Sequence, residues 1–178
     1  MENSFLTSLL NSTHKKESFN CGKDLLDGYI KRQASQDVKK RISACFVLIN
    51  NENNIIGYYT LSNSSISREL LPLEIIRKLP PTYLNLPITL LGRLAIDKSN
   101  FGKGVGEKLL MDALKRAFLT SVHQIASMAV VVDPIDNEAI SFYEKYGFIL
   151  IPNSGKMFLT MNTISKLFEP TSPPMPKD

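Results

Sequence analysis

The chain has 178 residues and a mass of 20.0 kDa, with 43% apolar residues, a net charge of +4 and a pI near 9.0. This length and apolar content predict one globular domain, and the mild positive charge favours an acidic partner such as RNA, although the phosphates of a cofactor explain it equally well. No apolar run approaches the roughly 20 residues of a membrane span, no secretory signal opens the chain, and the two cysteines and two histidines are scattered, so we expect a cytoplasmic protein without a metal site or disulfide framework.

The first half of the chain alternates between strand and helix patterns. The expected elements are a short strand at 4–10, a helix within 19–36, strands at 41–50 and 55–61, and a short helix at 69–79. The two strands are joined by the turn-forming residues Asn51 to Asn54, which predicts a hairpin. Pro80 and Pro81 end the short helix, because the residue before a proline is disfavoured in helical conformation.

The middle of the chain predicts a phosphate-binding turn. Residues 88–96 are apolar at both odd and even positions, which is typical of a strand buried on two faces. Residues 108–118 carry apolar side chains at helical spacing. Gly102, Gly104 and Gly106 lie between them. A glycine turn before a helix leaves backbone N–H groups unpaired and accessible, which suits a pyrophosphate. The alternative is a glycine-rich helix entry that binds nothing.

Spacing narrows the choice of cofactor. A nucleotide triphosphatase loop needs a lysine followed by a hydroxyl residue, whereas Gly104 follows Lys103 here. The dinucleotide fingerprint needs Gly-x-Gly-x-x-Gly at the start of a βαβ unit, whereas this run is Gly-x-Gly-x-Gly in mid-chain. Neither class of enzyme is well supported.

The last third predicts a strand, a capped helix and a hairpin. Residues 126–132 form an apolar strand, and Asp136 is placed to cap a helix at 137–146 that Gly147 ends. Residues 148–151 and 156–161 predict a second hairpin. The proline-rich residues 167–178 are expected to be a mobile tail, which leaves one domain at 1–166.

The order of these elements and four motifs resemble the GNAT acetyltransferases, and in particular the acetyltransferase toxins of bacterial type II toxin–antitoxin modules. The motifs are FNCGKDLLD at 19–27, GYYTL at 57–61, LGRLAID at 91–97 and AISFYEKYGF at 139–148. The resemblance covers nearly the whole chain before the tail. It implies an α/β GNAT fold: a single mixed, mostly antiparallel sheet flanked by helices, with a parted pair of central strands that holds acetyl-CoA.

The resemblance also implies the cofactor-binding residues. The glycine turn is similar to the acetyl-CoA loop Gln/Arg-x-x-Gly-x-Gly/Ala. Phe101 departs from the first position but keeps its backbone N–H, so we expect the phosphate cradle to be retained. In the parted strand, backbone groups would bond the pantetheine arm and polarise the thioester carbonyl, a contribution of about 3 kcal/mol per donor. The implied residues are Leu94, Ala95, Ile96, Phe101, Gly102, Lys103, Gly104, Val105, Gly106 and Asn137.

Tyr143 is the candidate general acid, because a phenol within reach of the departing thiolate can protonate it. The alternative is core packing, since Ala139, Phe142, Tyr143 and Tyr146 follow helical spacing. No carboxylate or histidine stands out as a general base. An α-amine has a pKa near 8, whereas a lysine side chain has a pKa of about 10.4, so an α-amine depends less on a general base to become neutral. The absence of a base therefore favours α-amine substrates.

Basic residues form clusters that would meet RNA phosphates, although charge runs are also common on solvated faces. These candidates are Lys39, Lys40, Arg41, Arg77, Lys78 and Arg93, the last facing either the substrate opening or a core carboxylate. The resemblance implies acetylation of the α-amine of aminoacyl-tRNA, a homodimer and a neutralising ribbon-helix-helix antitoxin. The alternatives are an enzyme that acetylates a small amine or a protein N-terminus, and a non-catalytic module that binds CoA or a partner protein.

Overall fold

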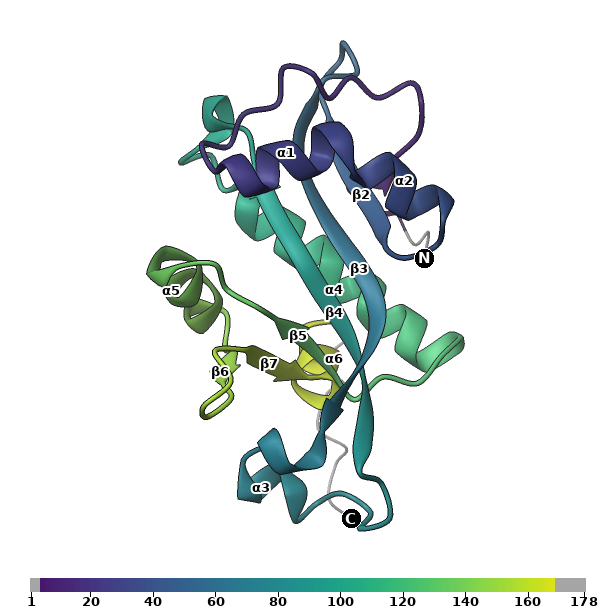
Figure 1. Ribbon diagram of the computed structural model, residues 1–178, viewed down its shortest axis with the longest axis vertical. Helices are drawn as coiled ribbons and strands as arrows, with labels where there is room; N and C mark the ends of the chain where they lie inside the picture. The colour runs from purple at the N-terminus through teal and green to yellow at the C-terminus, as the bar shows by residue number, and fades with distance from the viewer. Residues whose placement is uncertain (1–3, 169–178) are drawn as a thin grey trace, which may run out of the picture.

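The computed structural model describes residues 4–168, which form one seven-stranded mixed sheet with helices on both faces (Figure 1). The strand order is β1-β2-β3-β4-β5-β7-β6, and only the β4–β5 pair is parallel. The strands are β1 (Ser8–Leu9), β2 (Ala44–Ile49), β3 (Ile55–Ser67), β4 (Asn85–Ile96), β5 (Ala129–Val132), β6 (Ile149–Leu150) and β7 (Met157–Thr160). This is the mixed, mostly antiparallel sheet that the sequence predicts.

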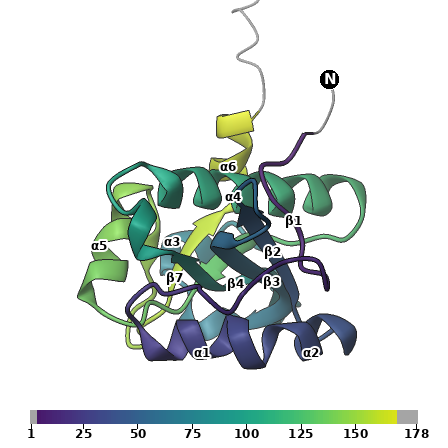
Figure 2. The same ribbon diagram turned by 90° about the horizontal axis from the view of Figure 1, so that it is seen from above.

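The helices form two layers around the sheet. They are α1 (Asp24–Arg32), α2 (Ala34–Lys39), α3 (Leu73–Ile76), α4 (Val105–His123), α5 (Asn137–Lys145) and α6 (Met161–Phe168), with the 3₁₀ turns η1 (Arg68–Leu70) and η2 (Lys98–Asn100). Figure 2 shows α1 and α2 on one face of the sheet and α4 and α6 on the other.

Each layer buries its own apolar stripe. On one face, Leu110 and Leu114 of α4 pack with Val130 of β5 in the largest core cluster. On the opposite face, Ile30 of α1 packs with Tyr58 of β3. A third cluster lies around the segment that contains α3. Because both faces are covered, the central strands are apolar on both sides, which explains the pattern of residues 88–96.

The sheet opens between β4 and β5. Their pairing covers only Thr89 to Leu91 of β4, opposite Val130 to Val132. The strand β5 ends where Asp133 and Pro134 follow, because a proline has no N–H for the ladder. On the other edge of β4, Thr60 pairs with Arg93 and Leu61 with Leu91, so Gly92 is a bulge residue without a partner. A bulge bends its strand. The pairing of β4 with β5 ends at Leu91, next to this bulge, so the central strands part there as predicted.

The predicted elements differ from the observed ones mainly at their ends. Both hairpins form, but the helix within 19–36 is two helices, and the helix at 69–79 is reduced to η1 and α3. The sequence missed α6, because residues 156–161 were expected to be strand and the tail to begin at residue 167. The helix continues to Phe168, whose ring stacks on Phe118 of α4 with centroids 6.3 Å apart. The rest of the predicted tail lies outside the described residues, and the domain boundary stays a prediction.

Candidate functional site

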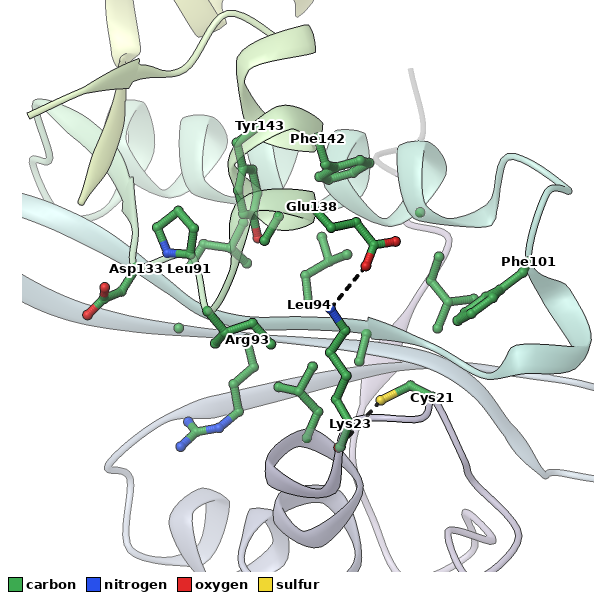
Figure 3. Close-up of a pocket in the computed structure, with 18 residues that line it drawn as sticks. Cys21, Lys23, Leu91, Arg93, Leu94, Phe101, Asp133, Glu138, Phe142 and Tyr143 are labelled. Carbon is green, nitrogen blue, oxygen red and sulfur yellow. Dashed lines mark hydrogen bonds and ion pairs between the residues drawn. The ribbon is translucent and has the colours of Figure 1, made fainter. Parts of the chain in front are cut away.

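A pocket of about 230 Å³ lies where β4 and β5 part, between β4 and α5 (Figure 3). Its walls are Leu91, Leu94 and Ile96 of β4 on one side and Phe142 and Tyr143 of α5 on the other. The pocket continues to the end of β4 and the start of α4, where Phe101 and Gly106 line it. We call this elongated pocket the slot.

Strand alternation decides which backbone groups of β4 face the slot. The N–H of Asp97 donates to the carbonyl of Ile56 over 2.9 Å, and the carbonyl oxygen of Ala95 lies 3.4 Å from where a Cβ on Gly57 would be. Successive residues of a strand direct their backbone groups to opposite edges. The open edge therefore presents the backbone of Leu94 and Ile96. The expectation for Ala95 is wrong in this respect, because its backbone faces β3, although the residue lines the slot.

The glycine turn uses two of its amides internally. The N–H of Phe101 donates to the carbonyl of Lys98 over 3.1 Å, and the N–H of Lys103 donates to the carbonyl of Asn100 over 3.4 Å. The ammonium of Lys103 also bends back, donating to the carbonyl of Ser99 over 2.7 Å. The N–H of Phe101 is thus not free for a phosphate, contrary to the expectation from the sequence. Its side chain is exposed and lines the slot.

The remaining amides of the turn are open. Gly102 and Gly104 have φ of 73° and 70°, a left-handed conformation that glycine adopts without a steric penalty. No atom lies within 4 Å of the positions that their Cβ atoms would occupy. Among residues 4–168, no acceptor is found for the N–H groups of Gly102, Gly104, Val105 and Gly106. These donors cluster at the positive end of the 19-residue helix α4, where an anion is stabilised.

Gly106 has a packing role at the same place. A Cβ there would lie 2.8 Å from Cδ1 of Ile96 and 3.7 Å from a ring carbon of Phe142. The first turn of α4 therefore contacts the end of β4 and lies against α5, which brings the open amides and the slot together.

Tyr143 lies at the other end of the slot. The residue is 7% exposed, and the centroid of its ring lies 5.3 Å from that of Phe142 and 5.2 Å from that of Phe148. The hydroxyl points into the slot (Figure 3), and no partner for it is found in the described part of the chain. Burial raises the pKa of Tyr143 above its ordinary value near 10, so the phenol is neutral at pH 7. The residue thus packs and also presents a protonated group to the slot.

The other candidate residues are dispersed. Arg93 lines the slot with its stem, but its guanidinium lies 3.7 Å over the ring of Tyr29 and points away from Tyr143 (Figure 3). No described carboxylate forms an ion pair with Arg93, and its contact with the substrate stays a prediction. Asn137 is exposed at the start of α5 and does not line the slot, whereas Glu138 and Ala139 do.

The predicted basic clusters also lie apart from the slot. Lys39 is the last residue of α2 and residues 40–41 follow it, whereas residues 77–78 follow α3; none of them lines the slot. In Figure 1, α3 lies at the bottom of the view and α2 at the right, on opposite sides of the molecule. Their proposed contact with RNA stays a prediction.

Sequence reasoning missed several residues of the slot. Glu138 and Ala139 lie one helical turn before Phe142 and Tyr143, so helical spacing places them beside these two residues. Cys21 and Lys23 reach the slot from the segment before α1. They lie in the motif FNCGKDLLD at 19–27, but spacing within that motif does not place them in a site. Burial raises the pKa of the Cys21 thiol to about 11, so this residue is an inert wall rather than a nucleophile.

Two classes of site are not found in residues 4–168. No group of three or more histidine, cysteine or acidic side chains is arranged to bind a metal ion there. The helices of that region are too short or too polar to span a bilayer.

Comparisons with known proteins agree with this geometry. Residues 41–150 match the acetyltransferase (GNAT) domain. A tRNA-acetylating toxin of Mycobacterium tuberculosis (strain ATCC 25618 / H37Rv) is 31% identical over 135 residues, which cover 76% of this chain and 78% of the toxin. The solved structure of AtaT complexed with acetyl-methionyl-tRNAfMet superposes with a TM-score of 0.84 and 28% identity, over 93% of this chain and 100% of AtaT. The Tyr-to-Phe variant of AtaT bound to the C-terminus of the antitoxin AtaR gives a TM-score of 0.77 and 26% identity, over 91% and 96% of the two chains.

Proposed function

Because this chain belongs to the GNAT acetyltransferase family, we propose that it transfers the acetyl group of acetyl-CoA to the α-amine of an aminoacyl-tRNA and so acts as a translation-blocking toxin. The observation that carries the proposal is the slot itself. It joins a cluster of open backbone amides at one end to the hydroxyl of Tyr143 at the other.

The residues present fit acetyl-CoA. The open amides of Gly102, Gly104 and the first turn of α4 would hold the pyrophosphate, since no acceptor for them is found among residues 4–168 and no protein atom lies within 4 Å of the Cβ positions of the two glycines. The backbone of Leu94 and Ile96 on the open edge of β4 would bond the pantetheine arm, as a neighbouring strand would. Acetyl-CoA then supplies a thioester whose carbonyl is attacked by the amine.

The chain contributes two effects to that reaction. Backbone N–H groups on the open edge of β4 stabilise the negative charge that develops on the carbonyl oxygen. Tyr143 donates its proton to the departing sulfur, and its raised pKa ensures that it carries that proton throughout the physiological pH range. The apolar walls Leu91 and Phe142 exclude water from the thioester.

The slot favours an amine that is already neutral near pH 7. Two carboxylates line it, and both are paired with lysines: Glu138 with Lys23 over 3.2 Å, and Asp133 with Lys156 over 2.8 Å. Neither is a free general base. An aminoacyl ester has an α-amine with a pKa near or below 8, so a substantial fraction is ready to attack, whereas a lysine amine is almost wholly protonated.

The proposal extends to partners and location. The similar toxin AtaT is found with tRNA and with the C-terminus of its antitoxin. We propose that this chain has a ribbon-helix-helix antitoxin, forms a homodimer and acts in the cytoplasm. We also propose that Lys39, Lys40, Arg41, Arg77 and Lys78 contact RNA phosphates.

One experiment tests the function. The protein is incubated with radiolabelled acetyl-CoA and total charged tRNA, and the label is then located. Label on the aminoacyl group is expected. Label on free polyamines or protein N-termini but not on charged tRNA would instead identify an acetyltransferase of small amines or protein N-termini. Cofactor binding by calorimetry without transfer to any amine would show a non-catalytic module.

A further inference from the structure

An ion pair crosses the slot between its two ends. Lys23, at the N-cap of α1, donates from its ammonium to the carboxylates of Asp136 and Glu138 at the start of α5, with a distance of 3.2 Å to Glu138. Figure 3 shows the side chain of Lys23 rising to Glu138 at a position between Phe101 and Tyr143. Both Lys23 and Glu138 line the slot. Any extended ligand that reaches from the glycine turn to Tyr143 must therefore pass this ion pair.

The loop that carries Lys23 is fastened to the end of β4. The N–H of Asn20 donates to Asp97 over 2.8 Å, and the N–H of Lys98 donates to the carbonyl of Asn20 over 2.9 Å. Asp97 also caps η2, the turn that leads into the open amides, by accepting from the N–H of Ser99 over 3.0 Å. Lys23 thus projects from a loop held in register with the proposed pyrophosphate site rather than from a free segment.

The other end of the ion pair is fastened to the helix that carries Tyr143. Asp136 is the N-cap of α5 and accepts from the N–H of Ala139 over 2.9 Å. Its hydrogen bond with Lys23 lowers the pKa of Asp136 below its ordinary value, so the carboxylate is charged at neutral pH. The ion pair therefore connects the loop of Lys23, which is fastened beside the glycine turn, to α5, the helix that carries the proposed acid Tyr143.

We propose that Lys23 is a positioning residue for the cofactor: its ion pair with Asp136 and Glu138 closes over the pantetheine arm and must open each time acetyl-CoA enters or CoA leaves. This inference rests on the proposed function, which places the arm in the slot. The opening of the ion pair is a step of cofactor exchange, whereas acetyl transfer at Tyr143 does not involve it.

The proposal has a kinetic signature. An exposed ion pair stabilises weakly, so its loss should accelerate cofactor dissociation about two- to fivefold. Salt screens such a pair. The dissociation rate of the wild-type protein should therefore rise with ionic strength, and a variant without the pair should have lost that part of the salt dependence.

The experiment compares Lys23→Met, which keeps an apolar stem but removes the charge, with the double variant D136N/E138Q. Asparagine still caps a helix, so α5 should form in the double variant. The double variant K156M/D133N is the matched control, because it removes a second lysine–carboxylate pair that does not cross the slot toward α5 and leaves no unpaired carboxylate behind. Dissociation of acetyl-CoA from immobilised full-length protein is measured by surface plasmon resonance from about 0.05 to about 0.5 M salt, with thermal unfolding recorded for each variant.

Faster dissociation in both slot variants, no further increase when they are combined, and an unchanged rate in the control would support the proposal. Dissociation rates equal to that of the wild-type protein would overturn it, and so would an equal acceleration in the control. A lower unfolding temperature without faster dissociation would assign the ion pair to stability alone and also overturn it. Absence of acetyl-CoA binding to the wild-type chain would instead refute the proposed function.

Discussion

Replacement of Tyr143 by phenylalanine separates the catalytic role of this residue from its packing role. The ring packs against Phe142 and Phe148, and these contacts remain in the variant. The hydroxyl points into the slot and has no hydrogen-bond partner among residues 4–168, so its removal leaves no protein donor or acceptor unsatisfied. We therefore expect the free energy of unfolding to change by less than about 0.5 kcal/mol.

The rate should respond very differently. A positioned general acid contributes about 10²- to 10⁴-fold, so the rate constant for acetyl transfer should fall by at least about 100-fold, or about 2.7 kcal/mol of activation free energy at about 1.36 kcal/mol per tenfold change. The affinity for acetyl-CoA should be unchanged, because the open amides and the edge of β4 are untouched.

The assay is single-turnover transfer from radiolabelled acetyl-CoA to charged tRNA, with calorimetry for cofactor affinity and urea denaturation for stability. Tyr146→Phe is the control, since this half-buried tyrosine of the same segment does not line the slot. In the wild-type enzyme, kcat/KM should rise with pH up to about 8 as the α-amine loses its proton. It should then show no decrease up to about pH 9, since burial keeps Tyr143 protonated over that range. A wild-type transfer rate in Tyr143→Phe, or a large loss of stability, would refute the reasoning.

Three further predictions follow from buried or strained positions. Asp112→Ala should lower the free energy of unfolding by about 3–5 kcal/mol in urea denaturation. The buried carboxylate of Asp112 accepts hydrogen bonds from the hydroxyl of Tyr59 over 2.7 Å, from the N–H of Leu6 and from the hydroxyl of Thr7, and a loss under about 1 kcal/mol would contradict this prediction. Gly104→Ala should weaken acetyl-CoA binding in calorimetry, since the added Cβ enters the open space beside the free amides, whereas Gly147→Ala, at a similar positive φ, should cost stability only; equal affinities in the two variants would count against the proposed cradle. Burial raises the pKa of Cys45 from 9.0 to about 12, so the stability that the neutral thiol contributes is complete below about pH 9 and is lost as the pH rises toward 12, at about 1.4 kcal/mol per pH unit. In urea denaturation, the free energy of unfolding of Cys45→Ala should therefore decline less steeply at alkaline pH than that of the wild-type protein, and an identical decline would be inconsistent with this assignment.

The sequence by itself determined the features that depend on neighbouring residues. The left-handed turn at Gly102 and Gly104, the cap of α5 by Asp136 and the hairpin after β2 are all local, because turn conformation and helix capping are set within four or five residues. The resemblance to acetyltransferase toxins rests on motifs of the same length. These local features were sufficient to identify the fold and to propose a place for the cofactor.

The tertiary structure decided everything that depends on contacts between distant segments. Pairing with β3 directs the backbone of Ala95 away from the slot, and stacking on Tyr29 turns Arg93 away from the proposed acid. The helix α6 forms against α4, where its apolar face becomes buried, and Lys23 meets α5 more than a hundred residues later in the chain. A local sequence pattern cannot predict which strand, ring or carboxylate will lie opposite a residue, because that contact forms only when the sheet and its helices pack together.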